Sequence, residues 1–154
     1  MALQQGDLAP DFALPDQNGT VRRLGEWRGR RLIIFFYPKD MTSGCTREAC
    51  DFRDAAGRID ALGAEVVGIS ADPPKRHRKF IEKESLPFTL LSDETHATLE
   101  AYGVWVEKSM YGRRYMGIER TTFVLDPEGR IERVERKVSV PGHVEEILDG
   151  MEHA

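Results

Sequence analysis

The chain has 154 residues and a formal net charge of −4 at pH 7. This length is enough for one domain with a hydrophobic core, and the acidic balance argues against nucleic acid as a partner. No apolar run approaches the length that crosses a membrane, and the first residues show no secretion signal. Two cysteines are too few for a disulfide scaffold and fit a reducing compartment. We therefore expect a single cytoplasmic domain over residues 1–154, away from membranes.

The first part of the chain predicts a β-hairpin. Residues 9–14 are typical of an edge strand or an extended arm because of their proline. Residues 16–19 contain an Asn-Gly pair, which suits a tight turn, and residues 20–24 return as a short strand. Residues 25–30 are expected to form a loop or a short helical turn.

The next segment predicts a buried central strand followed by a helix. Residues 32–37 form a short apolar and aromatic run without Gly or Pro, and Pro38 ends it. Thr42 and Ser43 are both residue types that can cap a helix. The apolar residues that follow recur at intervals of three and four, which places them on one face of a helix. They are Cys45, Ala49, Phe52, Ala56, Ile59 and Leu62.

Cys45 therefore lies in the first turn of this helix, just beyond the end of a strand. Free amide groups and the helix dipole favour an anion there, so both favour the thiolate over the thiol. This position indicates a reactive cysteine. The alternative is that Cys45 is only a small buried hydrophobic residue.

Cys50 follows five residues later. In an intact helix this spacing turns the two side chains about 140° apart and separates their Cα atoms by roughly 8–9 Å. A disulfide requires less than about 7 Å. The two cysteines can therefore bond only if the first turns of the helix unwind, unless Cys50 has no redox role at all.

Residues 64–70 predict a second buried strand, and a helix is expected after it. Ser70 or Asp72 is expected to cap this helix, with Pro73 near its first position. Residues 75–79, KRHRK, are basic. One short basic run on an acidic chain is typical of a solvated helix face rather than a nucleic-acid patch.

Residues 88–91 predict a third strand, and residues 95–102 predict a short helix that Gly103 ends. Residues 104–117 are expected to form a long irregular loop, rich in aromatic and methionine side chains. Such loops are often functional, although these side chains could equally pack the loop onto the core.

The end of the chain predicts two more strands and a helix. Residues 121–125 and 131–138 are expected to pair as a hairpin, and apolar spacing within residues 144–151 predicts a final helix. The alternation of strands and helices requires parallel pairing, and the closing hairpin adds antiparallel strands. We therefore expect an α/β fold with a mixed central sheet and helices on both faces.

Three residues at fixed spacing, Pro38, Thr42 and Cys45, match the P-x-x-x-T-x-x-C signature of peroxiredoxins. The longer string YPKDMTSGCTREACDFRD is similar to the peroxiredoxin Q (bacterioferritin comigratory protein) subfamily, whose members often carry a second cysteine five residues after the first. The resemblance runs from APDFALPDQNG to GIERTTFVLDPEGRI and covers nearly the whole chain. Ser43 departs from the subfamily, which usually has Pro there. This departure affects the stiffness of the loop more than the chemistry.

The resemblance implies a thioredoxin-like fold and a thiol-dependent peroxidase that acts on hydrogen peroxide and organic hydroperoxides. The Cys45 thiolate would attack the peroxide and become a sulfenic acid, and Cys50 would condense with it to a transient Cys45–Cys50 disulfide. Thioredoxin would then restore both thiols. The resemblance also implies a monomer, and we expect no cofactor. Which peroxide is preferred does not follow from the sequence.

Four other residues complete the expected site. Thr42 can offer a hydroxyl to the peroxide, and Pro38 is expected to shape the loop and to shield the sulfur from water. The resemblance selects Arg120, in GIERTTF, as the cation beside the sulfur, because spacing alone cannot choose among many arginines. Glu48, in CTREA, matches a recurrent family position and could anchor the loop or the arginine.

Two other functions compete with this interpretation. A thiol–disulfide oxidoreductase on the same fold would pair its cysteines as C-x-x-C, and the C-x-x-x-x-C spacing argues against it. A redox sensor or holdase without efficient peroxide turnover is the alternative from a different class. A metal site is not expected, because the histidines form no recognisable ligand set with the cysteines. They are His77, His96, His143 and His153, and most are expected to face solvent.

Overall fold

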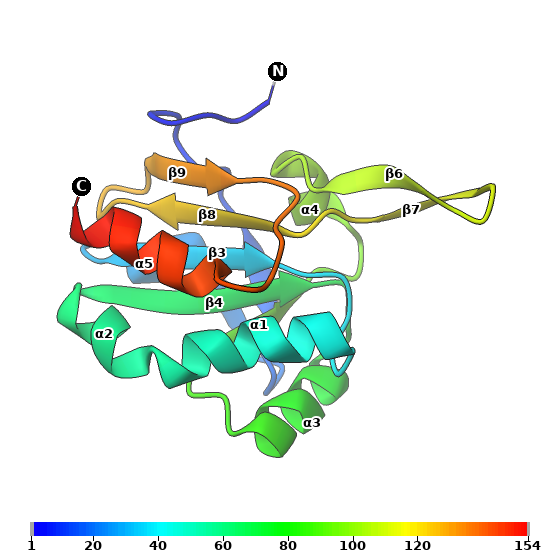
Figure 1. Ribbon diagram of the computed structural model, residues 1–154, viewed down its shortest axis with the longest axis horizontal. Coiled ribbons are helices and arrows are strands. Elements are labelled where there is room, and N and C mark those ends of the chain that lie inside the picture. Colours follow the sequence, from blue (N-terminus) through cyan, green and yellow to red (C-terminus); the bar gives the residue numbers. More distant parts are fainter. Residues whose placement is uncertain (1, 154) are drawn as a thin grey trace.

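A five-stranded sheet forms the centre of the computed structural model, which describes residues 2–153 (Figure 1). Three neighbouring strands are parallel: β5 (Thr89–Ser92), β4 (Ala64–Ser70) and β3 (Arg31–Phe36). β8 (Thr121–Leu125) pairs antiparallel with β3, and β9 (Ile131–Glu135) pairs antiparallel with β8. The expected mixed sheet is confirmed, although β9 ends earlier than residues 131–138 predicted.

Apolar side chains cover both faces of the sheet, which is why β3 is a continuous apolar run rather than an alternating one. Successive residues of a strand point to opposite faces. Leu32, Ile34 and Phe36 belong to one cluster of buried residues, and Ile33, Phe35 and Tyr37 belong to the other. β3 is therefore the buried central strand that the sequence predicts.

Helices lie on both faces, as expected (Figure 1). The face that holds Phe35 is covered by α1 (Ser43–Asp54), α2 (Ala56–Ala61), α3 (Pro74–Glu84) and α5 (His143–Glu152). The face that holds Phe36 is covered by α4 (Ala97–Ala101), the 3₁₀ turn η1 (Leu24–Trp27) and the hairpin of β1 (Ala13–Pro15) with β2 (Val21–Arg23). Within residues 2–153, no helix combines the length and the apolar character needed to cross a membrane.

Two details of the predicted helices were wrong. The long helix expected from Cys45 to Leu62 is divided, because the backbone leaves helical geometry at Ala55 (φ −97°, ψ 9°) between α1 and α2. Neither Ser70 nor Asp72 caps α3, since Pro73 takes the N-cap position. The carboxylate of Asp72 instead accepts a hydrogen bond from the Ser70 hydroxyl at 2.7 Å, inside the protein.

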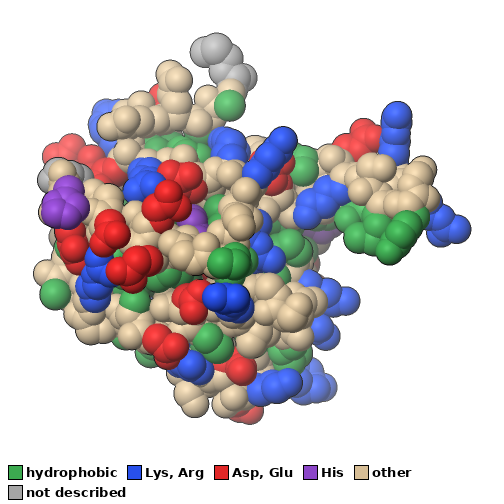
Figure 2. Space-filling model, viewed as in Figure 1, with side chains coloured by type: hydrophobic (Ala, Val, Ile, Leu, Met, Phe, Trp, Pro, Cys, Tyr) green, Lys and Arg blue, Asp and Glu red, His purple; other side chains and the backbone are tan. Residues whose placement is uncertain are grey.

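Residues 104–117, expected as an irregular loop, instead form a β-hairpin that projects from the body of the protein (Figure 1). Its strands are β6 (Trp105–Met110) and β7 (Arg113–Ile118). Tyr111 and Gly112 form the turn. Both have a left-handed conformation, with φ of 52° and 77°, as the two central residues of a type I′ turn require. Most of the hairpin is exposed, so its strands lack the alternating apolar pattern by which a half-buried strand is recognised. Apolar side chains lie on its surface (Figure 2): Met110, Tyr111, Tyr115 and Met116.

The expectation that most histidines face solvent was also wrong. His77 and His143 are buried, and His96 stacks on Trp105 with ring centroids 3.9 Å apart. His77 is the middle residue of the basic run in α3, so that run is not a uniformly solvated face. The missed signal is helical spacing, because His77 lies three residues before the buried Phe80.

His143 provides a test of this burial. Burial lowers the pKa of His143 from 6.5 to about 4, and its Nε2 lies 2.8 Å from the Thr122 hydroxyl oxygen. Between these pH values the unfolded chain binds a proton that the folded chain does not, so stability falls as the pH drops from 6.5 to about 4. His143→Gln removes this loss and is expected to gain up to about 3 kcal/mol over the parent across that window.

The measurement is the free energy of unfolding in urea at several pH values. His153→Gln, at an exposed position, is the matched control. If both variants followed the same pH dependence, the effect could not be assigned to the buried His143.

Candidate active site at the start of helix α1

Cys45 is the third residue of α1, in the first turn after the loop that follows β3. Thr42 occupies the N-cap position, and a hydrogen bond of 2.8 Å from Thr46 N–H to Thr42 C=O closes the first turn. The amide groups within this turn have no acceptor in the helix, so they leave positive potential near Cys45. The Cys45 side chain is 1 % exposed and packs in the cluster that holds Phe52.

Arg120 lies beside the sulfur. Its Nη2 donates to Cys45 Sγ at 3.2 Å, and its side chain is 16 % exposed. This position follows from the sheet, because Arg120 directly precedes β8, and Thr121 of β8 pairs with Phe36 at the end of β3. Gly44 permits the close approach, since a Cβ there would lie 3.3 Å from Arg120 Nη2. A cation at this distance favours the thiolate form of a cysteine.

Glu48 holds the arginine from one turn further along α1. Its Oε1 accepts a hydrogen bond from Arg120 Nη1 at 2.7 Å, and its side chain is fully buried. Burial raises the pKa of Glu48 to about 7, and the positive charge of Arg120 opposes this rise. Among the residues that the structure describes, Glu48 Oε2 has no hydrogen-bond partner. Glu48 thus fixes one side of the guanidinium and leaves the other side facing the sulfur.

Thr42 and Pro38 lie in the loop that leads to Cys45. Thr42 is exposed, makes no side-chain capping bond, and donates its hydroxyl proton to Lys39 C=O at 2.8 Å. Pro38 is half-buried, two residues after the end of β3. The structure therefore places Arg120 in contact with both Cys45 and Glu48, and it leaves the proposed roles of Thr42 and Pro38 as predictions.

Cys50 is half-buried on the same helix, and both cysteines are free thiols. Burial raises the pKa of the Cys50 thiol, and Arg53 opposes this effect. The raised pKa favours the thiol form of Cys50 near neutral pH, so Cys50 is poorly suited to attack a peroxide. Since α1 is continuous through both cysteines, their Cα atoms are roughly 8–9 Å apart, too far for a disulfide in this form.

A buried polar cluster behind the loop was not predicted from the sequence. Asp40, in the loop, places its Oδ2 2.6 Å from His77 Nδ1, and its N–H donates to Asp72 at 2.8 Å. These three residues are close enough together to hold a metal ion. However, protein hydrogen bonds already engage both nitrogens of His77 and both carboxylate oxygens of Asp40. Hydrogen bonding accounts for the cluster without a metal.

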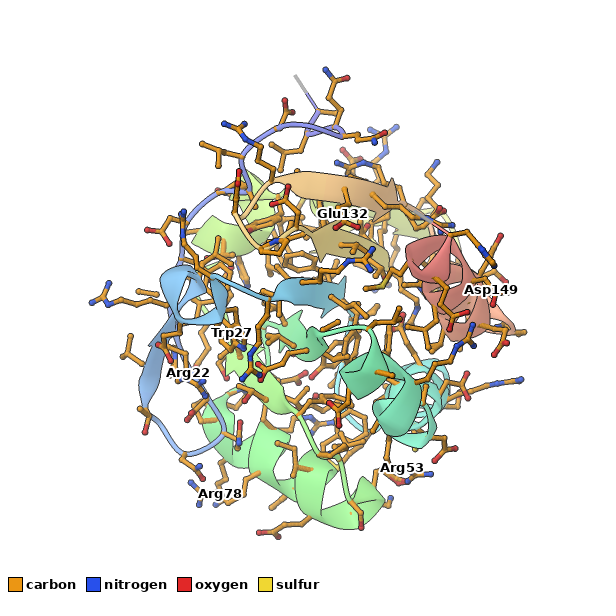
Figure 3. All side chains as sticks on the ribbon, turned by 90° about the vertical axis from the view of Figure 1, so that its left-hand side faces the viewer. Arg22, Trp27, Arg53, Arg78, Glu132 and Asp149 are labelled. Carbon is orange, nitrogen blue, oxygen red and sulfur yellow. The ribbon has the colours of Figure 1, made fainter. Side chains whose placement is uncertain are left out.

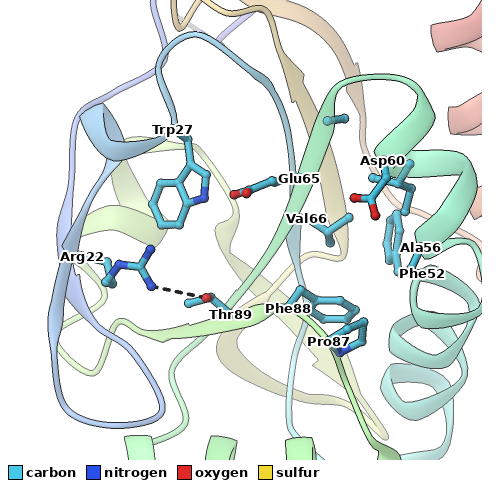
Figure 4. A pocket seen from close by; sticks show the side chains of 12 residues that line it. Arg22, Trp27, Phe52, Ala56, Asp60, Glu65, Val66, Pro87, Phe88 and Thr89 are labelled. Carbon is cyan, nitrogen blue, oxygen red and sulfur yellow. Dashed lines mark hydrogen bonds between the residues drawn. The ribbon is translucent and has the colours of Figure 1, made fainter.

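A surface pocket of about 320 Å³ lies at the opposite end of the strands (Figure 4). Ala64 and Thr89, at the beginnings of β4 and β5, line it, whereas Cys45 follows the end of β3. Arg22 in this pocket places its Cζ 5.0 Å from the centre of the Trp27 ring (Figures 3 and 4). Its Nε also pairs with Glu26 Oε1 at 2.7 Å. Its charge is thus already neutralised, and none of the candidate site residues lines this pocket.

Glu48 predicts a pH effect opposite in sign to that of His143. Its folded-state pKa of about 7 lies above its ordinary value of 4.5, so the folded chain keeps a proton that the unfolded chain loses as the pH rises. The stabilisation that comes from this raised pKa is complete below pH 4.5, and it is lost as the pH rises to about 7. Glu48→Gln is therefore expected to gain, relative to the parent, up to about 3 kcal/mol of unfolding free energy over this rise.

Urea unfolding at a series of pH values measures this gain. Glu82→Gln, at an exposed position on α3, is the control. A constant difference between Glu48→Gln and the parent at every pH would contradict the prediction, because it would show that folding does not change the pKa of Glu48.

Comparison with known proteins gives the family of the chain. The model of the AhpC/TSA family matches residues 5–134. A putative peroxiredoxin bcp of Coxiella burnetii is 48 % identical over 148 residues, which are 96 % of this chain and 98 % of the relative. Peroxiredoxin Bcp of Bacillus subtilis is 47 % identical over 148 residues, covering 96 % of this chain and 94 % of the relative.

Solved structures point to the same family. Xanthomonas campestris peroxiredoxin Q gives a TM-score of 0.90 at 40 % identity, covering 98 % of this chain and 96 % of that chain. A cysteine-to-serine mutant of Xylella fastidiosa PrxQ gives 0.93 at 33 % identity, covering 99 % and 98 %. These neighbours confirm the expected thioredoxin-like fold. The chain belongs to the AhpC/TSA family as a peroxiredoxin of the Bcp/peroxiredoxin Q type, and it is a thiol-dependent peroxidase.

Proposed function

We propose that Cys45 is the peroxide-reactive thiolate of this peroxidase and that Cys50 is the thiol that resolves its oxidised form. The observation that carries the proposal is the 3.2 Å contact between Arg120 Nη2 and Cys45 Sγ at the start of α1. A buried sulfur that faces both a helix start and a guanidinium is suited to react as an anion.

The first step is an in-line displacement. The Cys45 thiolate attacks one peroxide oxygen, the O–O bond breaks, and the other oxygen leaves as hydroxide or alkoxide and takes up a proton. The new S–O bond makes Cys45 a sulfenic acid. Arg120 stabilises the negative charge as it moves from sulfur to oxygen, and Thr42 supplies a hydroxyl to the peroxide. Pro38 shapes the loop that limits access of water to the sulfur.

The second step joins the two cysteines. The Cys50 thiol attacks the sulfur of the sulfenic acid, the S–S bond forms, and water leaves. Because α1 holds the Cα atoms roughly 8–9 Å apart, the first turns of this helix must unwind for the bond to form. Cys45 lies only two residues from the N-terminal end of α1, so this unwinding is limited to the end of the helix.

The third step is reduction by a thioredoxin dithiol, which returns both cysteines to the thiol state. Both reacting cysteines lie on one helix, so the cycle needs no residue from a second copy and a monomer suffices. Two free cysteines are suited to a reducing compartment, so we place the protein in the cytoplasm. The substrates we propose are hydrogen peroxide and organic hydroperoxides.

Substitution of each cysteine tests this cycle. Cys45→Ser is expected to consume no peroxide, because the nucleophile is absent. Cys50→Ser is expected to consume one equivalent per protein and then to recycle poorly with thioredoxin, because its sulfenic acid has no partner. The measurement combines turnover with catalytic thioredoxin and intact masses after a single equivalent of hydrogen peroxide and a thiol-blocking quench.

The parent should show a Cys45–Cys50 linkage in the peptide map. A stable oxygen adduct on Cys45 of the parent, with Cys50 still free, would remove the resolving role. Peroxide consumption without turnover by thioredoxin would favour a sensor over a thioredoxin-dependent enzyme.

Arg120→Ala is expected to lower the second-order rate of peroxide reduction by roughly 100-fold, the usual effect of losing one donor to a developing oxyanion. Arg120→Lys keeps the charge but cannot contact Cys45 and Glu48 with two coplanar donors, so an intermediate rate is expected. Arg114→Ala is the control, since this arginine is 82 % exposed on the β6–β7 hairpin. An unchanged rate in Arg120→Ala would exclude Arg120 from the site.

A further inference from the structure

The loop between β3 and α1 (residues 37–42) is anchored by a buried side chain that the proposed chemistry does not use. Asp40 lies at its centre and is fully buried. Each of its polar groups has a protein partner. The carboxylate contacts the Tyr37 hydroxyl and His77 Nδ1 (2.6 Å), the N–H donates to Asp72 (2.8 Å), and the C=O accepts from Arg76 (3.0 Å).

Asp40 and His77 share a single proton. His77 Nε2 lies 2.9 Å from Leu91 C=O and must carry a hydrogen, because a carbonyl oxygen only accepts. The proton between His77 Nδ1 and Asp40 Oδ2 belongs either to an imidazolium or to a carboxylic acid, and in both forms the pair is neutral overall. Burial raises the pKa of Tyr37 well above its ordinary value, so its hydroxyl stays protonated and donates to Asp40. The cluster is therefore fully hydrogen-bonded, as a buried polar group requires.

This cluster ties the loop to elements other than α1. His77 belongs to α3, Leu91 belongs to β5, and Asp72 follows the end of β4. Directly after Asp40, Met41 has a φ of 63°, a left-handed conformation that is unfavourable for a residue with a Cβ. A strained residue of this kind persists only when its surroundings hold it. Release of Asp40 would therefore allow the backbone just before Thr42, the N-cap of α1, to relax.

We propose that the Asp40–His77 pair is a positioning element that holds the first turn of α1 in its peroxide-reactive form and so opposes the unwinding that brings Cys45 to Cys50. The pair acts through the loop, since the hydrogen bond to Cys45 Sγ comes from Arg120. This inference rests on the proposed Cys45–Cys50 cycle. The inference predicts opposite changes in two rate constants: loosening the pair slows the peroxide step and speeds the disulfide step. A general loss of stability does not predict this combination.

Four variants and one control test the pair. Asp40→Ala and His77→Leu break it. Asp40→Asn preserves it, because the amide oxygen accepts from Tyr37 and the amide nitrogen donates to Nδ1 of a neutral His77. Tyr37→Phe removes a single hydrogen bond and is the mildest change. Lys79→Ala, at an exposed position on α3, is the matched control.

Each variant is checked by circular dichroism, reduced, mixed with hydrogen peroxide, and quenched at intervals with a thiol-blocking reagent. Intact masses then separate the thiol, sulfenic acid and disulfide forms and give one rate constant for each step. Asp40→Ala and His77→Leu are expected to slow the peroxide step at least about ten-fold and to speed the disulfide step at least about three-fold. Asp40→Asn and Lys79→Ala should match the parent in both steps within about two-fold.

Tyr37→Phe is expected to shift both rates in the same directions by less, and it carries the test if either disruptive variant does not fold. Disruptive variants that slow both steps, slow the peroxide step alone, or change neither step would overturn the proposal. A parent that forms no disulfide would refute the proposed cycle and this inference with it. A parent that forms the disulfide, with variants that behave like it, would refute this inference alone.

Discussion

The antiparallel pairing of β8 with β3 is the constraint on which the site depends. Because Thr121 pairs with Phe36, Arg120 leaves the sheet beside the point where β3 gives way to the loop and α1. One strand pair thus brings together a guanidinium and a sulfur that are 75 residues apart in the chain. A slip of one residue would turn each side chain to the opposite face. The residues of β8 are buried on both faces, as are most residues of β3, so such a slip would disrupt close packing on both sides of the sheet.

Within that frame, the three side chains of the site depend on one another. The guanidinium of Arg120 is planar, so its bond to Glu48 through Nη1 fixes the direction in which Nη2 points toward Cys45. The same bond explains why an acid is found in the core, since Arg120 offsets part of the cost of burying Glu48. The geometry at the sulfur therefore rests on an acid that has no contact with the sulfur among the hydrogen bonds of the described residues.

Local patterns were enough to predict the parts of the fold that are built locally. The continuous apolar run of β3 and the spacing of Cys45 and Phe52 both followed from the sequence. Each of these signals is carried by residues that lie close together in the chain. Arg120 could be chosen only through family resemblance, since its contact with Cys45 depends on strand order, which no local spacing encodes. His77 was misread because its basic neighbours dominated the pattern. The β6–β7 hairpin was missed because only its base, at Trp105 and Ile118, packs on the core.

The unequal environments of the two thiols give the proposed cycle a direction. With α1 intact, the guanidinium of Arg120 faces the sulfur of Cys45, whereas burial disfavours the anion of Cys50. The proposed disulfide forms only with the start of α1 unwound, so it separates Cys45 from this guanidinium. Reduction lets the helix rewind, and rewinding returns Cys45 to the contact that the next peroxide step requires.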